Sequence, residues 1–162
     1  MRMFIMSVSL LLATIAFSAA AEVPINGEPS AAAHARARFS AKFYVMHWDA
    51  PDRIDYSYRN GELSLHVQHF GPTDAEKADL RIHVKTNARG RYAVPAQATA
   101  AYNVLGCAHR IDPGSYVEIT RMDFERIEGR FELNGQCQAA PASSQAMREG
   151  RFRLAFDKPR PR

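Results

Sequence analysis

The chain of 162 residues has room for one domain, and 46% of its residues are hydrophobic, which is enough to form a core. The formal net charge is only +4, and three of the positive charges, Lys158, Arg160 and Arg162, lie in the last five residues. A nucleic-acid-binding protein would carry a concentrated basic face, so we expect no nucleic-acid partner. Residues 158–162 are predicted to be a solvated basic tail.

Residues 1–21 have the features of a secretory signal peptide. Arg2 gives a positive start, an apolar run extends from Phe4 to Phe17, and small residues stand at Ala19–Ala21, where signal peptidase cuts. The run is too short to span a membrane as a helix, and no later stretch is long and apolar enough to do so. We therefore expect an exported protein, periplasmic or secreted, that starts at Glu22; cleavage one residue earlier fits nearly as well.

The mature chain contains two cysteines, Cys107 and Cys137. In an oxidising compartment an even number of cysteines favours a disulfide. The alternatives are free thiols, a metal pair, or a catalytic thiol that uses the nearby His109 as its base. A metal site needs about four ligands, and no CxxC or histidine pattern supplies the others. We predict a structural disulfide and no cofactor.

Residues 22–38 are rich in Ala, Pro and Gly and show little periodicity, so we predict a flexible lead-in. Within it, Ala31–Arg38 could form one or two helical turns. Alternation of apolar and polar residues begins at Phe39 and predicts a strand from Phe39 to Trp48. The predicted domain is residues 39–157.

Several short alternating segments follow, separated by turns. Ile54–Tyr58 and Glu62–Phe70 flank Asn60-Gly61, which is the strongest hairpin signal because both residues tolerate positive φ. Further strands are predicted at Leu80–Lys85, from Tyr92 to Val94, more weakly at Ala98–Leu105, and at Arg151–Phe156. Residues 139–150 are predicted to be a mobile loop.

The clearest pattern runs from Ser115 to Leu133. After a short break at Met122–Glu125, apolar residues and glycine alternate without error with Arg126, Glu128, Arg130 and Glu132. A strand sends successive side chains to opposite faces, so this segment has one apolar face and one face of alternating charge. We predict an antiparallel hairpin with its apolar face inward. The charged face is most simply a solvated surface, and a partner surface is the alternative.

Eight or nine short alternating strands and no long amphipathic helix predict an all-β fold. Alternation favours antiparallel pairing, and the regular spacing favours a single β-sandwich or a small barrel, with one disulfide. The residues predicted to point inward are Phe43, Val45, Leu63, Leu65, Val67, Leu80, Ile82, Val84, Ile119, Ile127, Phe131, Leu133, Phe152, Leu154 and Phe156.

The run Gly114–Asp123, followed by Ile127–Phe131, resembles a signature of small secreted bacterial β-domains known as a domain of unknown function. Segments similar to Gly90–Val94 and Gly150–Phe152 occur in the same order in that family, so the resemblance covers residues 63–156. It implies a secreted β-sandwich and assigns no catalytic residue.

The sequence contains no HExxH, GxSxG, P-loop or Gly-rich dinucleotide motif. Carboxylates cluster in two turns, at Asp49, Asp52 and Asp55 and at Asp123 and Glu125, and a small hydrolase could use such a pair. Acids in turns more commonly accept hydrogen bonds from the backbone. We retain a small envelope hydrolase as an alternative function.

Two outward-facing histidines, His66 and His83, could lie side by side and bind a metal. However, Arg81 and Lys85 flank His83 on the same face and disfavour a bound cation. A metal-handling protein is therefore the weaker alternative, and solvated surface histidines are the simpler interpretation.

Five aromatic residues gather near the loops in the first third of the domain and are candidates for a partner surface: Tyr44, Trp48, Tyr56, Tyr58 and Phe70. Exposed aromatic groups can form a platform for a glycan or a peptide. The simpler interpretation, which we favour, is that most of them close the open end of the sandwich.

These observations favour a non-enzymatic binding or interaction module of the cell envelope. We expect a monomer whose partner is an envelope protein or a cell-wall glycan.

Overall fold

The computed structural model describes residues 27–43, 46–73, 76–139 and 144–157. The described residues form one helical turn and eleven strands. The elements are α1 (Ala31–His34), β1 (Arg38–Phe43), β2 (Met46–Trp48), β3 (Arg53–Arg59), β4 (Glu62–His69), β5 (Ala78–Lys85), β6 (Gly90–Val94), β7 (Ala98–Val104), β8 (Cys107–Ile111), β9 (Ser115–Asp123), β10 (Arg126–Cys137) and β11 (Ser144–Ala155).

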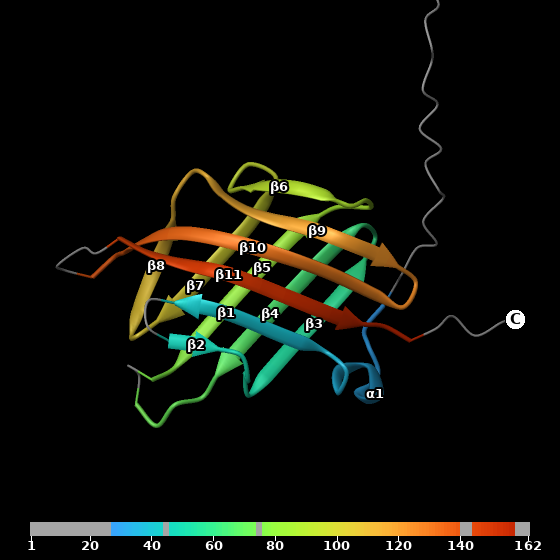
Figure 1. The fold of residues 1–162 in the computed structure, drawn as a ribbon, viewed down its shortest axis with the longest axis horizontal. Helices are drawn as coiled ribbons and strands as arrows, with labels where there is room; N and C mark the ends of the chain where they lie inside the picture. The colour runs from blue at the N-terminus through green and yellow to red at the C-terminus, as the bar shows by residue number, and fades with distance from the viewer. Residues whose placement is uncertain (1–26, 44–45, 74–75, 140–143, 158–162) are drawn as a thin grey trace, which may run out of the picture.

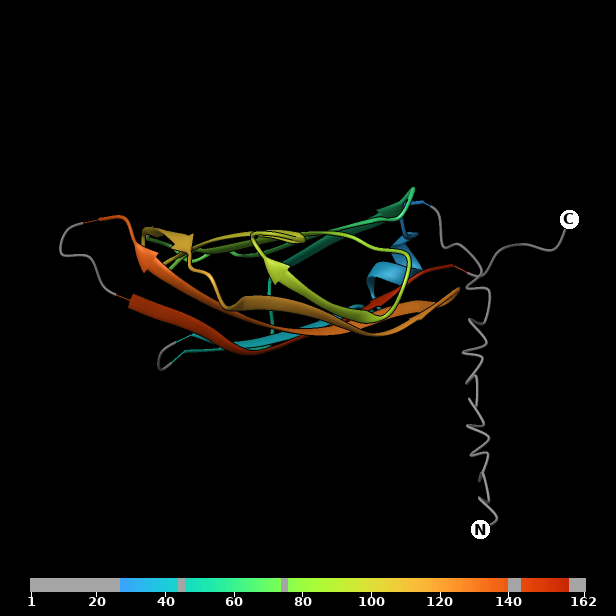
Figure 2. The ribbon, with the colours of Figure 1, turned by 90° about the horizontal axis from the view of Figure 1, so that it is seen from above.

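The strands form one antiparallel sheet with the order β2-β1-β11-β10-β8-β7-β5-β4-β3, to which β9 adds beside β10 and β6 adds beside β9. This sheet curls over into two layers (Figures 1 and 2). Strands β1, β2, β9, β10 and β11 form the first layer, and β3, β4, β5, β7 and β8 form the second, which crosses behind it. The predicted all-β antiparallel fold is confirmed.

Strand β10 joins the two layers. Its first seven residues, Arg126 to Glu132, pair with β9 in the predicted hairpin, whereas Gly135–Cys137 pair with β8. Cys107 and Cys137 form the predicted disulfide at this junction, with a Cα–Cα distance of 5.7 Å. The two cysteines are 30 positions apart in the sequence. A cross-link that closes a loop of this length stabilises the fold by about 3–4 kcal/mol on the chain-entropy model.

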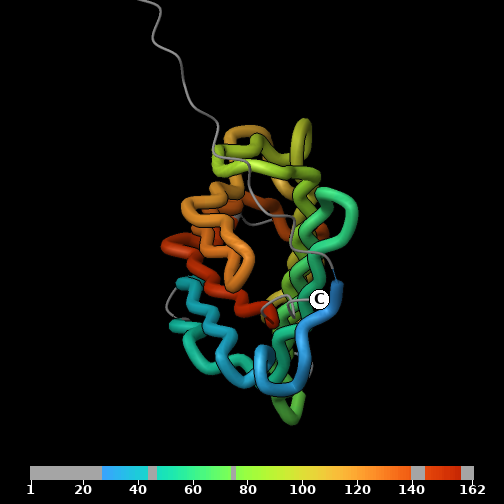
Figure 3. Tube along the Cα trace, turned by 90° about the vertical axis from the view of Figure 1, so that its right-hand side faces the viewer, coloured from blue at the N-terminus to red at the C-terminus, as the bar shows by residue number. Residues whose placement is uncertain are grey.

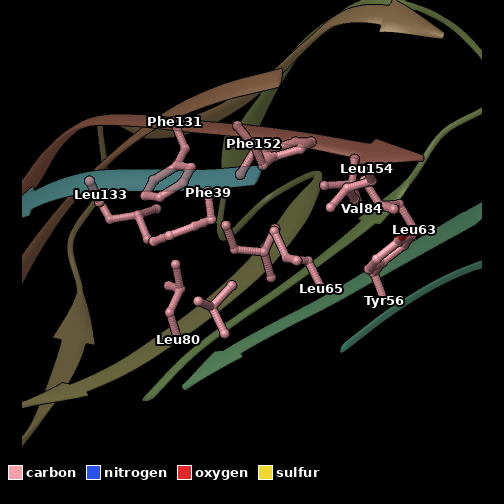
Figure 4. Packing of buried hydrophobic residues seen from close by; sticks show 14 of the residues in the cluster. Phe39, Tyr56, Leu63, Leu65, Leu80, Val84, Phe131, Leu133, Phe152 and Leu154 are labelled. Atoms are coloured by element: carbon pink, nitrogen blue, oxygen red, sulfur yellow. The ribbon is translucent and has the colours of Figure 1, made fainter. Parts of the chain in front are cut away.

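The core lies between the two layers. Fourteen of the residues predicted to point inward are described, and each of them is at most 4% exposed; Val45 lies outside the described residues. Figure 4 shows side chains of β1, β10 and β11, such as Phe131 and Phe152, meeting Leu65 and Leu80 from the other layer. Figure 3 shows the same two layers end-on.

The tripeptide Gly-Arg-Phe occurs once in β10 and once in β11, and it explains how these strands pack. Gly129 pairs with Phe152, and Phe131 pairs with Gly150. Each ring occupies the space that a Cβ at the opposite glycine would need: a Cβ at Gly129 would lie 2.3 Å from Cζ of Phe152. The register then places Arg130 directly opposite Arg151 on the outer face.

The strands differ from the sequence prediction in three places. The segment from Phe39 to Trp48 is not one strand but the hairpin β1–β2, in which Ala41 pairs with Trp48. Strand β11 begins at Ser144, inside the predicted loop of residues 139–150, because small residues and a register shift near Glu149 hide the alternation. Strand β8 was not predicted, because the residue at the centre of its inward face is His109.

The described part of the predicted lead-in is docked on the domain rather than flexible. Gly27 and Tyr58 exchange backbone hydrogen bonds, and Ser30 donates to the carboxylate of Asp157 from its backbone N–H and its hydroxyl, both at 2.8 Å. Helix α1 is the single turn that the sequence allowed, and Ala33 is fully buried. No helix in the described part of the chain is long and apolar enough to cross a membrane.

Candidate functional site

A groove of about 550 Å³ lies on the outer face of the first layer, across β10, β11 and β1. In Figure 1 these strands run side by side, and no described strand or helix crosses this face. The residues that line the groove are Arg38, Phe39, Ser40, Asp49, Thr120, Glu128, Gly129, Arg130, Arg151, Phe152 and Arg153.

The register of the sheet concentrates positive charge in the groove. Arg130 in β10 lies opposite Arg151 in β11, and Arg153 in β11 lies opposite Arg38 in β1. All four side chains point outward. Like charges directly opposite each other on a sheet are destabilising. The fold therefore contains two adjacent arginine pairs whose repulsion is offset only in part, by Glu118 opposite Arg130 and Glu128 opposite Arg153.

Arg130 is held by a carboxylate at one edge of the groove. Its guanidinium donates two hydrogen bonds of 3.1 Å to Glu118, and Arg91 donates to the same carboxylate at 3.2 and 3.3 Å. Arg91 also lies 4.0 Å from the centre of the Tyr116 ring. Desolvation alone would raise the pKa of Glu118, but the hydrogen bonds from Arg91 and Arg130 outweigh it and lower this pKa. Glu118 is thus an ionised anchor for both arginines.

The other three arginines of the pairs are less neutralised. Arg153 lies 3.4 Å from Glu128, which also lies 3.3 Å from Arg126. Arg38 donates to the backbone carbonyls of Ala35 and Ala37, at 3.0 and 2.7 Å. Those carbonyls orient the guanidinium without cancelling its charge.

Arg151 lies at the centre of the four, and it makes no hydrogen bond or ion pair with the residues that the structure describes. Its charge attracts Glu149 at longer range and helps to lower the pKa of that carboxyl, although the hydrogen bond from Lys42 is the largest cause. The groove therefore offers at least one guanidinium group that is available to a ligand.

Two hydroxyl groups and a carboxylate complete the lining. Thr120 donates its hydroxyl hydrogen to the backbone carbonyl of Glu128 at 3.1 Å, so its oxygen can still accept a hydrogen bond. Ser40 lies opposite Arg151, and Asp49 lies at the end of β2. Guanidinium groups bind carboxylate, phosphate and sulfate through parallel N–H donors, so this arrangement suits an anionic ligand that also has hydroxyl groups.

The predicted aromatic surface is corrected by the structure. Trp48, Tyr56 and Tyr58 belong to the core and are 6%, 5% and 4% exposed. The hydroxyl of Tyr56 donates to the carbonyl of Ala155 at 2.6 Å, and burial raises the pKa of Tyr56 to about 12. Only Phe70 of the described members is exposed, at 57%; Tyr44 lies outside the described residues. No shared aromatic platform forms among the four that are described.

Most of the turn carboxylates have structural partners. Asp52 accepts from the backbone N–H of Phe70 at 2.8 Å, which is the main reason why its pKa is lowered. Asp123 accepts from the backbone N–H groups of Glu125 and Arg126. Burial would raise the pKa of Asp123, but Arg121 and these backbone donors lower it. A general acid needs the opposite shift.

The two outward histidines lie on neighbouring strands but have separate partners. His66 pairs with Asp79 at 2.5 Å, and His83 lies 4.0 Å from Glu62. Within the described ranges, no group of three or more His, Cys, Asp or Glu residues is arranged to hold a metal ion.

The groove was missed by sequence reasoning because its charge depends on register. Arg130 and Arg151 are 21 positions apart and look like ordinary members of alternating strands. The available signal was the repeated Gly-Arg-Phe, because pairing each glycine with the opposite phenylalanine forces the two arginines to face each other.

Comparisons with models of protein families, with curated proteins and with solved structures found no match to this chain.

Proposed function

We propose that this protein is an exported, non-enzymatic binding module of the cell envelope that holds an anionic ligand in the arginine groove. The observation that carries the proposal is the pair of directly opposed arginine couples, Arg130 with Arg151 and Arg153 with Arg38. Arg130 and Arg153 each also lie opposite a glutamate on their other side, Glu118 and Glu128, whereas among the described strand pairs no carboxylate lies directly opposite Arg151 or Arg38. A bound anion would offset the repulsion within each couple.

Export is supported by two independent features. The first is the signal-peptide pattern of residues 1–21. The second is the disulfide between Cys107 and Cys137, which is typical of proteins in oxidising compartments. The resemblance of the β9–β10 hairpin to small secreted β-domains agrees with this location, and it adds no residue to the site.

Binding fits the lining better than catalysis does. Glu128 lies between the guanidinium groups of Arg126 and Arg153, at 3.3 and 3.4 Å, and is already part of an ion pair with both. The groove is also an open sheet face, whereas catalytic electrostatics depend on excluding water. We infer that the groove retains its ligand without transforming it.

Affinity for a simple polyanion tests the proposal. We expect the mature protein to bind low-molecular-weight dextran sulfate, and the variant Arg151→Gln/Arg153→Gln to bind it about tenfold or more weakly, because each lost charged hydrogen bond is worth roughly 1.5–3 kcal/mol. Isothermal titration calorimetry at two salt concentrations gives both the affinity and its salt dependence.

The matched control is Arg59→Gln/Arg81→Gln. These arginines lie on β3 and β5 in the other layer, and their side chains are 58% and 62% exposed, close to the 56% of Arg153. The control removes the same charge from the opposite face. Equal losses in the two variants would show that binding depends on net charge and not on the groove, and would refute the proposed function.

A further inference from the structure

We infer that the ligand of the arginine groove is an acidic glycan that carries one negative group on every second sugar. This inference rests on the proposed anion-binding function and adds the chemical class of the ligand. Three features of the groove support it: the spacing of the arginine couples, the charge of the lining and the hydroxyl-binding groups near the arginines.

The distance between the two anion positions follows from the pairing of β10, β11 and β1. Side chains directly opposite each other have Cβ atoms roughly 5 Å apart, so the two arginines of one couple can hold a single anionic group. The couples are displaced by two residues along β11, from Arg151 to Arg153, and by one strand across the sheet. Two residues span about 7 Å and one strand about 5 Å, so the two anion positions are about 8 Å apart along a diagonal.

A separation of this size is longer than the distance between neighbouring phosphates in a polyphosphate, which share an oxygen atom. Because arginine side chains are long and flexible, they can adapt this spacing to acidic groups on alternate sugars of a glycan chain. No described strand or helix crosses the outer face of β10, β11 and β1 (Figure 1), so no described element blocks a chain that continues beyond the groove. An extended polymer fits this surface better than a compact molecule, which normally needs an enclosed pocket.

The charge balance limits how densely charged the ligand can be. Four arginines line the groove together with two acids, Asp49 and Glu128, so the positive charge of the lining exceeds its negative charge by a small amount. A small excess suits a ligand whose anionic groups are widely spaced. A more densely charged polymer would bring further negative groups against Asp49 and Glu128, and like-charge contacts of this kind select against a partner.

The same acids favour a sugar. Asp49 and Glu128 can accept hydrogen bonds from hydroxyl groups, and so can the oxygen of Thr120, whose hydrogen is already donated to the backbone. Ser40 can both donate and accept. Acceptors interleaved with arginines match a chain in which hydroxyl groups alternate with acidic groups.

Two tetrasaccharides with the same backbone test the inference: unsulfated chondroitin, with a uronate on every second sugar, and chondroitin sulfate, with additional sulfate groups between the uronates. We expect calorimetry to show that the mature protein binds the unsulfated form about threefold or more tightly, because of the repulsion from Asp49 and Glu128. Neutral maltotetraose should show no measurable binding.

Two variants separate the contribution of the arginine charges to the affinity from that of the hydroxyl groups. Arg151→Gln/Arg153→Gln should lower the affinity for unsulfated chondroitin about tenfold, with Arg59→Gln/Arg81→Gln unchanged. Ser40→Ala/Thr120→Val should lower it about fivefold, through lost hydrogen bonds, and should affect dextran sulfate much less. Circular dichroism confirms that each variant is folded.

The outcomes distinguish this inference from the proposed function. Equal or tighter binding of chondroitin sulfate, or equal effects of Ser40→Ala/Thr120→Val on both ligands, would overturn the glycan assignment while anion binding stands. If neither chondroitin nor dextran sulfate binds, both the assignment and the proposed function fail.

Discussion

At the scale of single residues, Arg151 shows how binding and stability compete. Its guanidinium faces Arg130 across the strands and makes no hydrogen bond or ion pair within the described part of the chain. Replacing Arg151 with glutamine removes a like-charge contact and keeps most of the side-chain length. We therefore expect Arg151→Gln to raise the free energy of unfolding by about 0.5 kcal/mol in the absence of ligand.

Chemical denaturation at low salt measures this change, and the same protein should bind dextran sulfate more weakly. Arg81→Gln is the control, because Arg81 lies 3.2 Å from Asp79 and gains nothing from losing its charge. A loss of stability in Arg151→Gln would mean that Arg151 has a stabilising role that outweighs its repulsion from Arg130.

The glycine–phenylalanine pairs give a second prediction at this scale. A Cβ at Gly129 would also lie 2.7 Å from the carbonyl oxygen of Glu118, so neither the ring nor the backbone leaves room for it. We expect Gly129→Ala to lower the free energy of unfolding by about 1–3 kcal/mol through overpacking.

The double variant Gly129→Ala/Phe152→Leu checks the cause, because leucine vacates part of the space that the ring fills. Thermodynamic coupling in a double-mutant cycle is expected to show partial rescue. Additive losses would indicate that the contact with the Glu118 carbonyl dominates and that the ring is not the obstacle.

At the scale of elements, β10 is the central strand because it pairs with strands of both layers and forms part of the floor of the groove. Its residues Ile127–Arg130 form the sequence Ile-Glu-Gly-Arg, which the protease factor Xa recognises. These residues pair with β9 on one side and β11 on the other, and Ile127 is 1% exposed. A protease needs an extended, accessible segment, so cleavage requires β10 to leave the sheet.

We therefore expect the native protein to resist factor Xa and the reduced, denatured protein to be cut after Arg130. Gel electrophoresis over a time course measures both rates. Rapid cleavage under native conditions would show that the hairpin β9–β10 frays, and the groove could not then be a preformed site.

At the scale of the whole molecule, the alternation of apolar and polar residues predicted which side chains form the core. It did not predict which strands lie side by side. Hydrophobic residues with period two identified the core because each strand has one dry face, and this holds whatever the order of strands. Predicting the groove would have required the register between β1, β10 and β11, and no local sequence pattern contains this register. The sequence left open for a similar reason whether Tyr56 and Tyr58 form a surface or close the sandwich, because their hydroxyl partners come from distant segments.

Burial of tyrosines links the fold to pH. Desolvation raises the pKa of Tyr56 to about 12 and also raises the pKa of Tyr102. In the unfolded chain a tyrosine ionises near pH 10. The neutral phenol is favoured in the folded state, so its contribution to stability is complete below pH 10 and is lost as the pH rises from 10 to about 12.

Alkaline unfolding followed by circular dichroism should therefore begin above pH 10 and should coincide with tyrosinate absorbance from the buried residues. Tyr56→Phe removes one of these ionisations, so its stability should be lower at pH 7, where the bond to Ala155 is lost, and should fall less steeply between pH 10 and 12. An identical slope in the variant would exclude Tyr56 as a source of the pH dependence.

The measurement that tests the arginine groove most directly is a nuclear magnetic resonance titration of the mature, ¹⁵N-labelled protein with low-molecular-weight dextran sulfate. Arginine Nε–H signals and backbone amides report each strand separately. We predict that the largest shifts belong to Arg38, Arg130, Arg151 and Arg153 and to the amides of β1, β10 and β11, with little change in β3–β5. Shifts concentrated on β3–β5, or no shifts at all, would contradict the account.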